Sequence, residues 1–326
     1  MNEENLIEKI KQLSKKYSAT GQDLSSYLDG LLYADYIGYW NYIHLDTLLS
    51  LQTPKTDFPD EHIFIIYHQI TELYFKLCLL EIEQINKNGR KVIETGEDLG
   101  WNKTLKIDLF IEKMKRINRY LNNLIDSFEI MTKGMEKKQF LKFRMALLPS
   151  SGFQSVQYRM IELRSTNLSE LYPQNAQTSS KNLKTMYNNL YWKHGAIDLE
   201  SKKKTYTLKQ FERKYDERLI KLANKIKEKN IWAKYNSLSL KERKNKTLIK
   251  LLKEYDVNIN VNWKLAHYKS AVKYLKNKHN SVAATGGTNW ESFLPPKFQK
   301  IIFFPDLWTN KEKENWGKNW VKSILK

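Results

Sequence analysis

Glycine and proline are scarce in this chain, and their scarcity limits the folds open to it more than any other feature. Only 12 glycines and 7 prolines occur among the 326 residues. The long segments between them repeat apolar residues at helical spacing and not in alternation, which indicates helices and not strands. The sequence therefore predicts an all-α protein that contains no parallel sheet.

The same pattern indicates how the chain is organised. Neither a Gly/Ser-rich linker nor an internal repeat separates two halves. We expect one large helical-bundle domain over residues 1–326, with a core at about 25–165 and 258–308 and a basic helical elaboration at about 170–255. Helices are expected at roughly 3–17, 23–34, 40–52, 60–86, 103–131, 136–144, 153–165, 207–228, 239–255, 260–278 and 311–325.

Cysteine content and apolar runs indicate the compartment. The single cysteine, Cys78, excludes an internal disulfide framework and a zinc site built from cysteines. The N-terminal stretch MNEENLIEKIKQL is acidic and amphipathic, and runs such as IFIIY and LCLL are too short to span a bilayer. We expect a folded cytoplasmic protein without a membrane partner.

The net charge of +19 allows two interpretations. Clustered Lys and Arg neutralise phosphates, so a non-catalytic, basic helical nucleic-acid-binding protein is one of them. The lysines are spread along the chain, however, and in ESKKKTYTLKQFERKYDERLIKLANKIKEKN they alternate with acids on the expected outer face of a helix. We favour a solvated face and expect no nucleic-acid partner.

The stretch FPDEHIFIIYHQITELYFK places a histidine in an apolar helix. Pro59 and Asp60 predict the start of this helix, with Asp60 as its cap. Phe64 and His68 then lie one turn apart on one face. A histidine in such a place is more often hydrogen-bonded within a core than catalytic, and Glu72 is a candidate partner.

The stretch QFLKFRMALLPSSGFQSVQYRMIE concentrates polar side chains around a tight turn. Arg144 precedes the Pro-Ser-Ser-Gly turn, where a guanidinium is well shaped to bind a carboxylate through two hydrogen bonds. Gln154, Gln157 and Arg159 follow in the next expected helix. We expect these three side chains to join helices through buried hydrogen bonds.

Two further stretches contain candidate ligand-binding residues. In NINVNWKLAHYKSAVKYL, His267 lies among small and apolar residues of a helix, where an imidazole Nε2 can bind a metal or a haem iron. A core histidine without such a role is the other interpretation. In ATGGTNW, Thr285 precedes two glycines that allow the backbone to close over a small ligand.

Together these stretches resemble one family. DEHIFIIYHQITELYFK, FLKFRMALLPSSGFQSVQYRMIE, WKLAHYKSAVKYL and ATGGTNW follow, in order, the motifs of tryptophan 2,3-dioxygenase. YWNYIHLDTLLSLQ is similar to the N-terminal motif of that family, and the resemblance runs from residue 25 or so to residue 308. It implies a helical bundle with haem held between its helices.

The resemblance also implies roles for individual residues. His267 matches the proximal histidine that binds the iron of a b-type haem. His68 matches the distal histidine that hydrogen-bonds the indole N–H, and Phe64 matches the phenylalanine that packs on the indole. Arg144 matches the arginine that binds the substrate carboxylate, and Thr285 matches the threonine at the amino-acid end of the substrate.

The reaction and the assembly are implied in the same way. In the family, ferrous haem b supports insertion of dioxygen across the indole C2–C3 bond of L-tryptophan, which gives N-formyl-L-kynurenine in the kynurenine pathway of tryptophan catabolism. Family members form a homotetramer in which N-terminal aromatic residues reach into a neighbouring subunit's pocket. Tyr39 and Tyr42 match these residues, so we expect N-terminal segments exchanged between subunits.

The chain departs from the family pattern at two places. Phe140 stands where a tyrosine that helps to order the carboxylate is usual, so we expect weaker substrate binding. The loop reads Thr-Gly-Gly-Thr-Asn where Thr-Gly-Gly-Ser-Ser is usual, and the spacer before Thr285 is longer than in typical members. That spacer contains His279, a competitor of His267 for the iron. The alternative within this scaffold is a haem enzyme that oxygenates another indole or aromatic amino acid.

Overall fold

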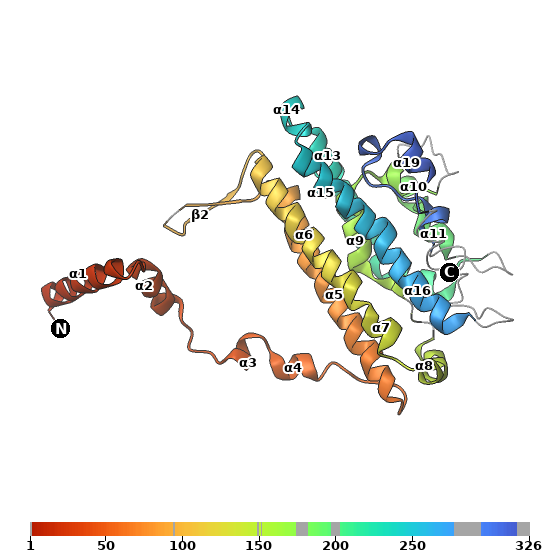
Figure 1. Ribbon diagram of the computed structural model, residues 1–326, viewed down its shortest axis with the longest axis horizontal. Coiled ribbons are helices and arrows are strands. Elements are labelled where there is room, and N and C mark those ends of the chain that lie inside the picture. The colour runs from red at the N-terminus through yellow and green to blue at the C-terminus, as the bar shows by residue number, and fades with distance from the viewer. Residues whose placement is uncertain are drawn as a thin grey trace. The chain divides into compact units, whose positions relative to one another are not determined.

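The computed structural model describes residues 2–93, 95–148, 150, 152–173, 182–196, 203–276 and 295–317. Within these residues the regular structure is helical, apart from one antiparallel hairpin formed by β1 (Arg90–Val92) and β2 (Asp98–Trp101). The prediction of an all-α fold is confirmed (Figure 1).

The α-helices, in chain order, are α1 (Glu3–Ala19), α2 (Leu24–Tyr33), α3 (Tyr39–Tyr42), α4 (Leu45–Leu49), α5 (Pro59–Asn86), α6 (Ile107–Ser127), α7 (Glu129–Lys133), α8 (Lys137–Phe143), α9 (Val156–Ser165), α10 (Leu183–Asn188), α11 (Tyr191–Gly195), α12 (Tyr206–Ile226), α13 (Ile231–Asn236), α14 (Leu240–Arg243), α15 (Lys246–Val257), α16 (Trp263–Leu275), α18 (Pro296–Gln299) and α19 (Asn310–Glu314). Short 3-10 turns are η1 (Arg144–Leu147), η2 (Gly152–Gln154), η3 (Leu168–Leu171) and η5 (Pro305–Leu307), and η4 (Asn258–Asn262) is a π turn.

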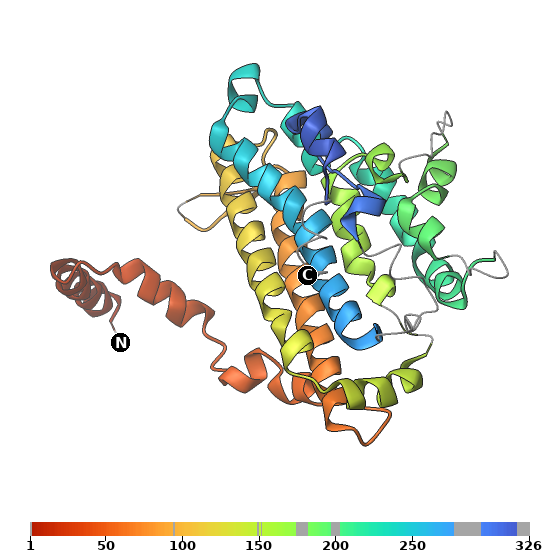
Figure 2. The same cartoon turned by 45° about the vertical axis from the view of Figure 1, so that its right-hand side comes forward.

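The centre of the bundle is formed by long helices that run side by side. Helices α5 and α6 pack along each other, α15 packs against α6, and α9 packs against α5 (Figures 1 and 2). Helix α12 packs in turn on α9. Their facing sides bury a hydrophobic core that includes Phe75, Ile82, Phe110, Ile117 and Leu252.

Helix α5 starts where the sequence predicted, but with a different cap. Pro59 occupies the first turn, where its missing N–H is not needed, and Phe58 is the residue before it. Asp60 does not cap the helix, because its carboxylate accepts a hydrogen bond from the backbone amide of Glu136 at 2.6 Å. The predicted Asp60 cap is therefore wrong, and the side chain joins α5 to the start of α8.

By length and composition alone, α5 is long and apolar enough to cross a membrane. In this fold it is a central helix of the bundle and carries the buried side chains of Asp60, Glu61 and Glu81. Glu81 pairs with Lys113 of α6 at 3.0 Å. A charged pair of this kind gives the helix polar partners inside the protein. Of its apolar window, 28% is buried, and Leu73 and Leu80 are each 51% exposed.

Helices α15 and α16 form one nearly continuous rod, where the sequence predicted a gap between two helices. The π turn η4 joins them, and in it the amide of Trp263 donates to the carbonyl of Asn258, five residues back. Asn258 also donates to the side chain of Asn122 on α6 at 2.9 Å, and Asn262 donates to Asn258 at 2.9 Å. The predicted gap at 256–259 is therefore wrong, and asparagine side chains hold the turn together.

The segment that follows α18 is attached to α15 by one carboxylate. Asp256 accepts hydrogen bonds from the backbone amides of Phe303 and Phe304, from the indole of Trp308 and from the side chain of Asn260, at 2.8 to 3.2 Å. Burial raises the pKa of Asp256 to about 6, against the effect of these donors. One side chain thus satisfies four donors from two parts of the chain.

Several short helices were not predicted from the sequence. Helices α10, α11 and α13 have five or six residues each, and they bury Tyr187, Trp192 and Trp232. Helices of this length depend on tertiary packing more than on local sequence. Of the helix predicted at 311–325, the structure shows α19, which ends at Glu314, and a turn at residues 315–317; residues 318–326 lie outside the described residues.

The stretch at about 170–255, predicted as an elaboration, supplies part of the core. Leu208, Phe211 and Leu219 on α12 are buried. The basic residues of the same helix that are exposed include Lys209, Arg213, Lys214 and Lys221. The prediction of a solvated basic face on this helix is confirmed.

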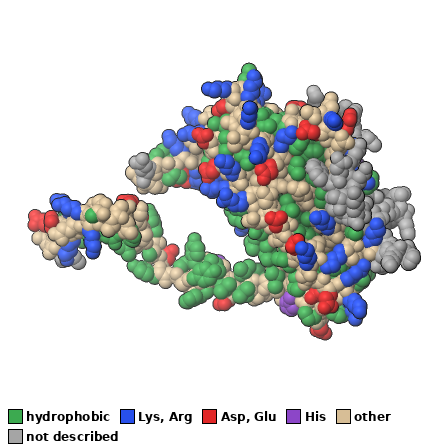
Figure 3. Space-filling model, viewed as in Figure 1, with side chains coloured by type: hydrophobic (Ala, Val, Ile, Leu, Met, Phe, Trp, Pro, Cys, Tyr) green, Lys and Arg blue, Asp and Glu red, His purple; other side chains and the backbone are tan. Residues whose placement is uncertain are grey.

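Contacts divide the chain into two compact units, Met1–Thr53 and Pro54–Lys326. The described residues of the first unit form α1 to α4, and none of them is buried. Its hydrophobic side chains gather on its own surface (Figure 3), with Leu32 76%, Tyr36 87% and Tyr42 73% exposed. So much exposed apolar surface calls for a partner surface. The single domain over residues 1–326 stays a prediction.

Candidate active site

His267 lies on α16 with its ring held in one orientation. Its Nδ1 is 2.9 Å from the carbonyl oxygen of Trp263. Because a backbone carbonyl only accepts hydrogen bonds, Nδ1 carries the proton and Nε2 keeps its lone pair. Trp263 and Phe128 pack against the ring, with centroid distances of 4.4 and 4.7 Å. Burial lowers the pKa of His267 to about 4, so the imidazole is neutral at pH 7.

His68 on α5 repeats this arrangement. Its Nδ1 is 2.7 Å from the carbonyl oxygen of Phe64, and the Phe64 ring covers it at a centroid distance of 4.1 Å. Burial lowers the pKa of His68 below its ordinary value. The expected bond to Glu72 is not formed, because the Glu72 carboxylate accepts a hydrogen bond from Gln157 at 2.8 Å. The lone pair on Nε2 of His68 is therefore available as an acceptor.

A series of aromatic rings connects the two histidines. The ring centroid of Tyr67 lies 6.4 Å from that of His68 and 5.6 Å from that of Phe128. Phe128 in turn packs on His267. The charge of His68 contributes to the lowered pKa of His267, so the two groups share one electrostatic environment. Protein atoms lie around both histidine rings, but each side chain still exposes part of its surface.

Helix α8 and the turn η1 add an aromatic wall and a cation. The ring centroids of Phe140 and Phe143 lie 6.3 and 5.8 Å from the ring centroid of Phe64. Arg144 follows directly and is 6% exposed. Burial lowers the pKa of Arg144 from its ordinary value. In such surroundings its attraction to a carboxylate is stronger than at a surface.

Phe140 offers no hydroxyl at the position where a tyrosine is usual in the family. Tyr274 packs on it at a centroid distance of 4.6 Å. The Tyr274 hydroxyl lies 2.6 Å from the carbonyl oxygen of Met131 and 3.1 Å from that of Met135, so its proton is already engaged. Tyr274 therefore does not replace the missing hydroxyl.

Gln154, Gln157 and Arg159 were predicted to join helices, and each of them forms side-chain hydrogen bonds. Gln157 donates to both the backbone carbonyl and the carboxylate of Glu72 at 2.8 Å, which joins α9 to α5. Gln154 donates to the carbonyl of Thr207 at 3.3 Å. Arg159 is 7% exposed and pairs with Glu162 at 2.7 Å. Arg159 also donates to the hydroxyl of Tyr191 on α11 at 3.2 Å. The prediction that the three side chains join helices is confirmed, but only Arg159 is buried, whereas Gln154 and Gln157 are partly exposed.

The predicted site residues fall into three groups. Tyr39 and Tyr42 belong to the first unit, where they are 70% and 73% exposed. Thr285 and His279 lie outside the described residues. The residues that the structure places on α5, α8, η1 and α16, elements that pack together within the second unit, are Phe64, His68, Phe140, Arg144 and His267. The roles of all these residues stay predictions.

Sequence reasoning missed Tyr67 and Phe128, which connect the histidines. Tyr67 adjoins His68 in the sequence but was not singled out, since a neighbour in a helix points to another face. Phe128 lies at the end of α6, and its contact with His267 joins segments far apart in the chain. No local pattern signals such a contact.

The fold and the site define a class of protein: an all-α bundle whose central helices present two neutral histidines, a buried arginine and an aromatic wall. The chain belongs to the tryptophan 2,3-dioxygenase family. The sequence model of this family matches residues 21–288, which confirms the resemblance inferred from the motifs.

Curated relatives agree with this assignment. A tryptophan 2,3-dioxygenase from Ruegeria sp. (strain TM1040) is 39% identical over 130 residues, which cover 40% of this chain and 42% of the relative. The protein of that name from Pseudomonas fluorescens is 33% identical over 130 residues, or 40% and 41% of the two chains. The protein of that name from Xenopus tropicalis is 33% identical over 138 residues, which cover 41% of this chain and 30% of the relative. Each match thus spans less than half of the relative.

Proposed function

We propose that the protein is a haem-dependent tryptophan 2,3-dioxygenase, which inserts dioxygen across the indole C2–C3 bond of L-tryptophan and forms N-formyl-L-kynurenine. The observation that carries this proposal is the matched geometry of His68 and His267. In each, Nδ1 is bound to the carbonyl of the preceding turn, and the lone pair of Nε2 is free. Membership of the family supports the same activity.

His267 is the residue that would hold the iron of haem b. A neutral imidazole with a free Nε2 lone pair is the form that binds iron, and the hydrogen bond from Nδ1 fixes the tautomer and raises the basicity of the ligand. The rings of Phe128 and Trp263 hold the imidazole plane in place. Ferrous haem, when bound, supplies the redox chemistry with dioxygen.

The remaining residues bind and orient the substrate. His68 accepts the indole N–H at Nε2, and Phe64 provides an apolar surface for the indole ring. Arg144 binds the carboxylate through two hydrogen bonds, which fixes the ring relative to the haem. Thr285 binds the amino-acid end. Because Phe140 has no hydroxyl, the carboxylate end is held by fewer hydrogen bonds than in relatives with tyrosine.

The proposal includes a homotetramer with exchanged N-terminal segments. The large exposed side chains of the first unit, including Tyr39 and Tyr42, support it, because such side chains are stabilised by burial against another subunit. A cytoplasmic location is part of the same proposal, and the lone Cys78 agrees with a reducing compartment.

The proposed activity is tested by anaerobic reduction of haem-loaded protein, followed by L-tryptophan and air. The haem spectrum, the dioxygen consumed and the absorbance of N-formyl-L-kynurenine are recorded together. We expect one dioxygen consumed for each product formed. Stable haem binding with L-tryptophan left unconverted would contradict the proposal and direct the search to other indoles or aromatic amino acids.

A further inference from the structure

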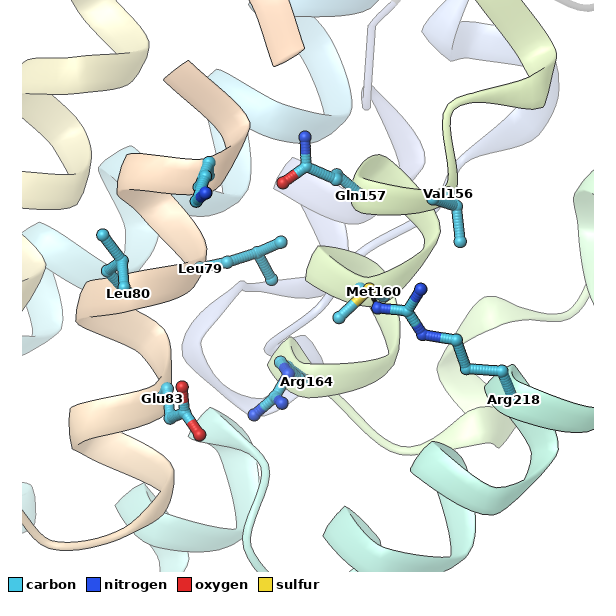
Figure 4. Close-up of a pocket in the computed structure, with 9 residues that line it drawn as sticks. Leu79, Leu80, Glu83, Val156, Gln157, Met160, Arg164 and Arg218 are labelled. Carbon is cyan, nitrogen blue, oxygen red and sulfur yellow. Dashed lines mark hydrogen bonds between the residues drawn. The ribbon is translucent and has the colours of Figure 1, made fainter. Parts of the chain in front are cut away.

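A cavity of about 380 Å³ lies between α5, α9 and α12. Its size is within the range of small-molecule sites. Leu79 of α5 extends toward α9, and Arg218 extends from α12 to Met160 of α9 (Figure 4). Val156 and Leu80 complete the apolar part of the lining. The cavity therefore has room and apolar surface for an organic molecule.

Three cations line this cavity, and none of them forms a salt bridge with a described residue. Lys76, Arg164 and Arg218 take part in no ion pair there. Arg218 contacts only the sulfur of Met160, at 3.8 Å. The one acid in the lining, Glu83, is paired at 2.7 Å with Lys87, which is not part of the lining. The cavity thus has an excess of positive charge.

Arg164 shows the clearest need for an anion. One of its terminal nitrogens donates to the side chain of Asn86 at 3.1 Å. Its Nε is buried and has no hydrogen-bond partner among the described residues. Burial lowers the pKa of Arg164, and the nearby charge of Glu83 only partly offsets this effect. A buried donor without an acceptor costs free energy, which makes the Arg164 side chain a costly one to leave without a counter-charge.

We propose that this cavity binds a small organic carboxylate, with its head on Arg164 and Arg218 and its apolar body against Leu79, Val156 and Met160. An apolar body is required because uncharged side chains form much of the lining. The site is independent of the proposed oxygenation. Lys76 lies eight residues beyond His68, about 12 Å along α5, and the oxygenation uses none of the cations that line the cavity.

The test uses the purified full chain with methyl-labelled methionine and NMR titration. Met160 lines the cavity, whereas Met145 follows Arg144 and reports on the substrate site. The probes are octanoate, acetate as a head without a body, and octylammonium as the same body with opposite charge. We expect octanoate to shift the Met160 signal saturably at concentrations where acetate and octylammonium leave it unchanged. A shift of Met145 alone, or equal shifts with octylammonium, would overturn the proposal.

Variants make the test specific. Arg218→Gln changes an exposed residue, and Arg164→Gln changes the half-buried one. Each should weaken octanoate binding about tenfold, since a charged hydrogen bond is lost. Arg213→Gln, an exposed arginine of α12 outside the lining, is the matched control and should bind as the unmodified protein does. Unchanged binding in the folded Arg218→Gln variant would rule the site out.

Discussion

His68 and His267 have the same hydrogen-bond geometry but different surroundings. His267 is packed between Trp263 and Phe128, whereas His68 is covered by Phe64. A ring packed between two aromatic side chains is suited to a fixed ligand. A ring that shares one face of α5 with a phenylalanine is suited to a flat substrate. Substitution should therefore separate the two roles.

We expect His267→Ala to lose haem and His68→Ala to retain it. Removal of the axial ligand leaves no imidazole for the iron, whereas removal of the distal imidazole costs one hydrogen bond to the indole. The second variant should reduce kcat/KM for L-tryptophan about tenfold. Haem retention is measured by Soret absorbance after gel filtration. His62→Ala, an exposed histidine of α5, is the control. A normally ligated haem in His267→Ala would move the assignment to His279.

The pH dependence of substrate binding should follow His68. Its pKa is lowered by burial from 6.5, so Nε2 keeps its lone pair below pH 6.5. The KM for L-tryptophan should be constant from pH 8 to about 6.5 and should rise only at lower pH, as the ring becomes protonated. Steady-state kinetics in that range, with His68→Gln as a variant without a titrating group, provides the measurement. A rise that begins above pH 7 would contradict a lowered pKa.

At the scale of elements, Asp256 joins α15 to the segment that carries Phe303 and Phe304. Asp256→Ala leaves four donors without their acceptor and should lower the free energy of unfolding by about 3 kcal/mol or more. Asp256→Asn keeps one carbonyl oxygen as an acceptor and should lower the free energy of unfolding by less. Urea unfolding measures both, and Asp126→Ala on the exposed side of α6 is the control. If Asp256→Ala lowered the free energy of unfolding by less than about 1 kcal/mol, the hydrogen bonds to Asp256 would not be needed for stability.

Helices were predicted correctly where apolar residues recur regularly along one helix face. Helix α5 follows from apolar periodicity and from Pro59, and its ends fall within a residue of the prediction. The turn η4 does not follow, since Asn258, Asn260 and Asn262 have side chains that usually interrupt helices. Their partners, including Asn122 of α6, lie outside the local sequence. The gap predicted at 256–259 is therefore closed by hydrogen bonds whose partners no local pattern signals.

The candidate site was predicted in the same uneven way. Phe64 and His68 are one turn apart in the sequence, so their contact is a local property of α5. The proximity of His267 depends on how α16 packs on α7 and α8, and only the family resemblance pointed to it. Phe128 joins the two histidines through contacts that no sequence spacing encodes.

At the scale of the whole molecule, the first unit carries apolar side chains that none of its own elements bury. If Tyr39 and Tyr42 complete a neighbouring subunit's pocket, two inactive variants should restore each other. Co-expression of Tyr39→Ala/Tyr42→Ala with Arg144→Gln should give mixed oligomers in which some pockets are intact. We expect turnover above that of either variant alone.

The control for this experiment combines Arg144→Gln with His68→Ala. Both changes affect the pocket formed by the second unit of a single chain, so mixing cannot produce an intact site. Restored activity in this control would indicate subunit effects unrelated to the N-terminal segment. Absence of restoration in the first mixture, with mixed oligomers shown by mass spectrometry, would contradict the exchange.

The π turn η4 has a consequence for how the gene tolerates changes of length. It holds one residue more than a regular helix with the same ends. Loss of a single codon between Asn258 and Asn262 would allow an uninterrupted α-helix, and the residues after it would turn by about 100° around the axis. His267 would then face a different neighbour although every remaining amino acid was unchanged. In this stretch the number of residues, as well as their identity, decides the direction in which His267 points.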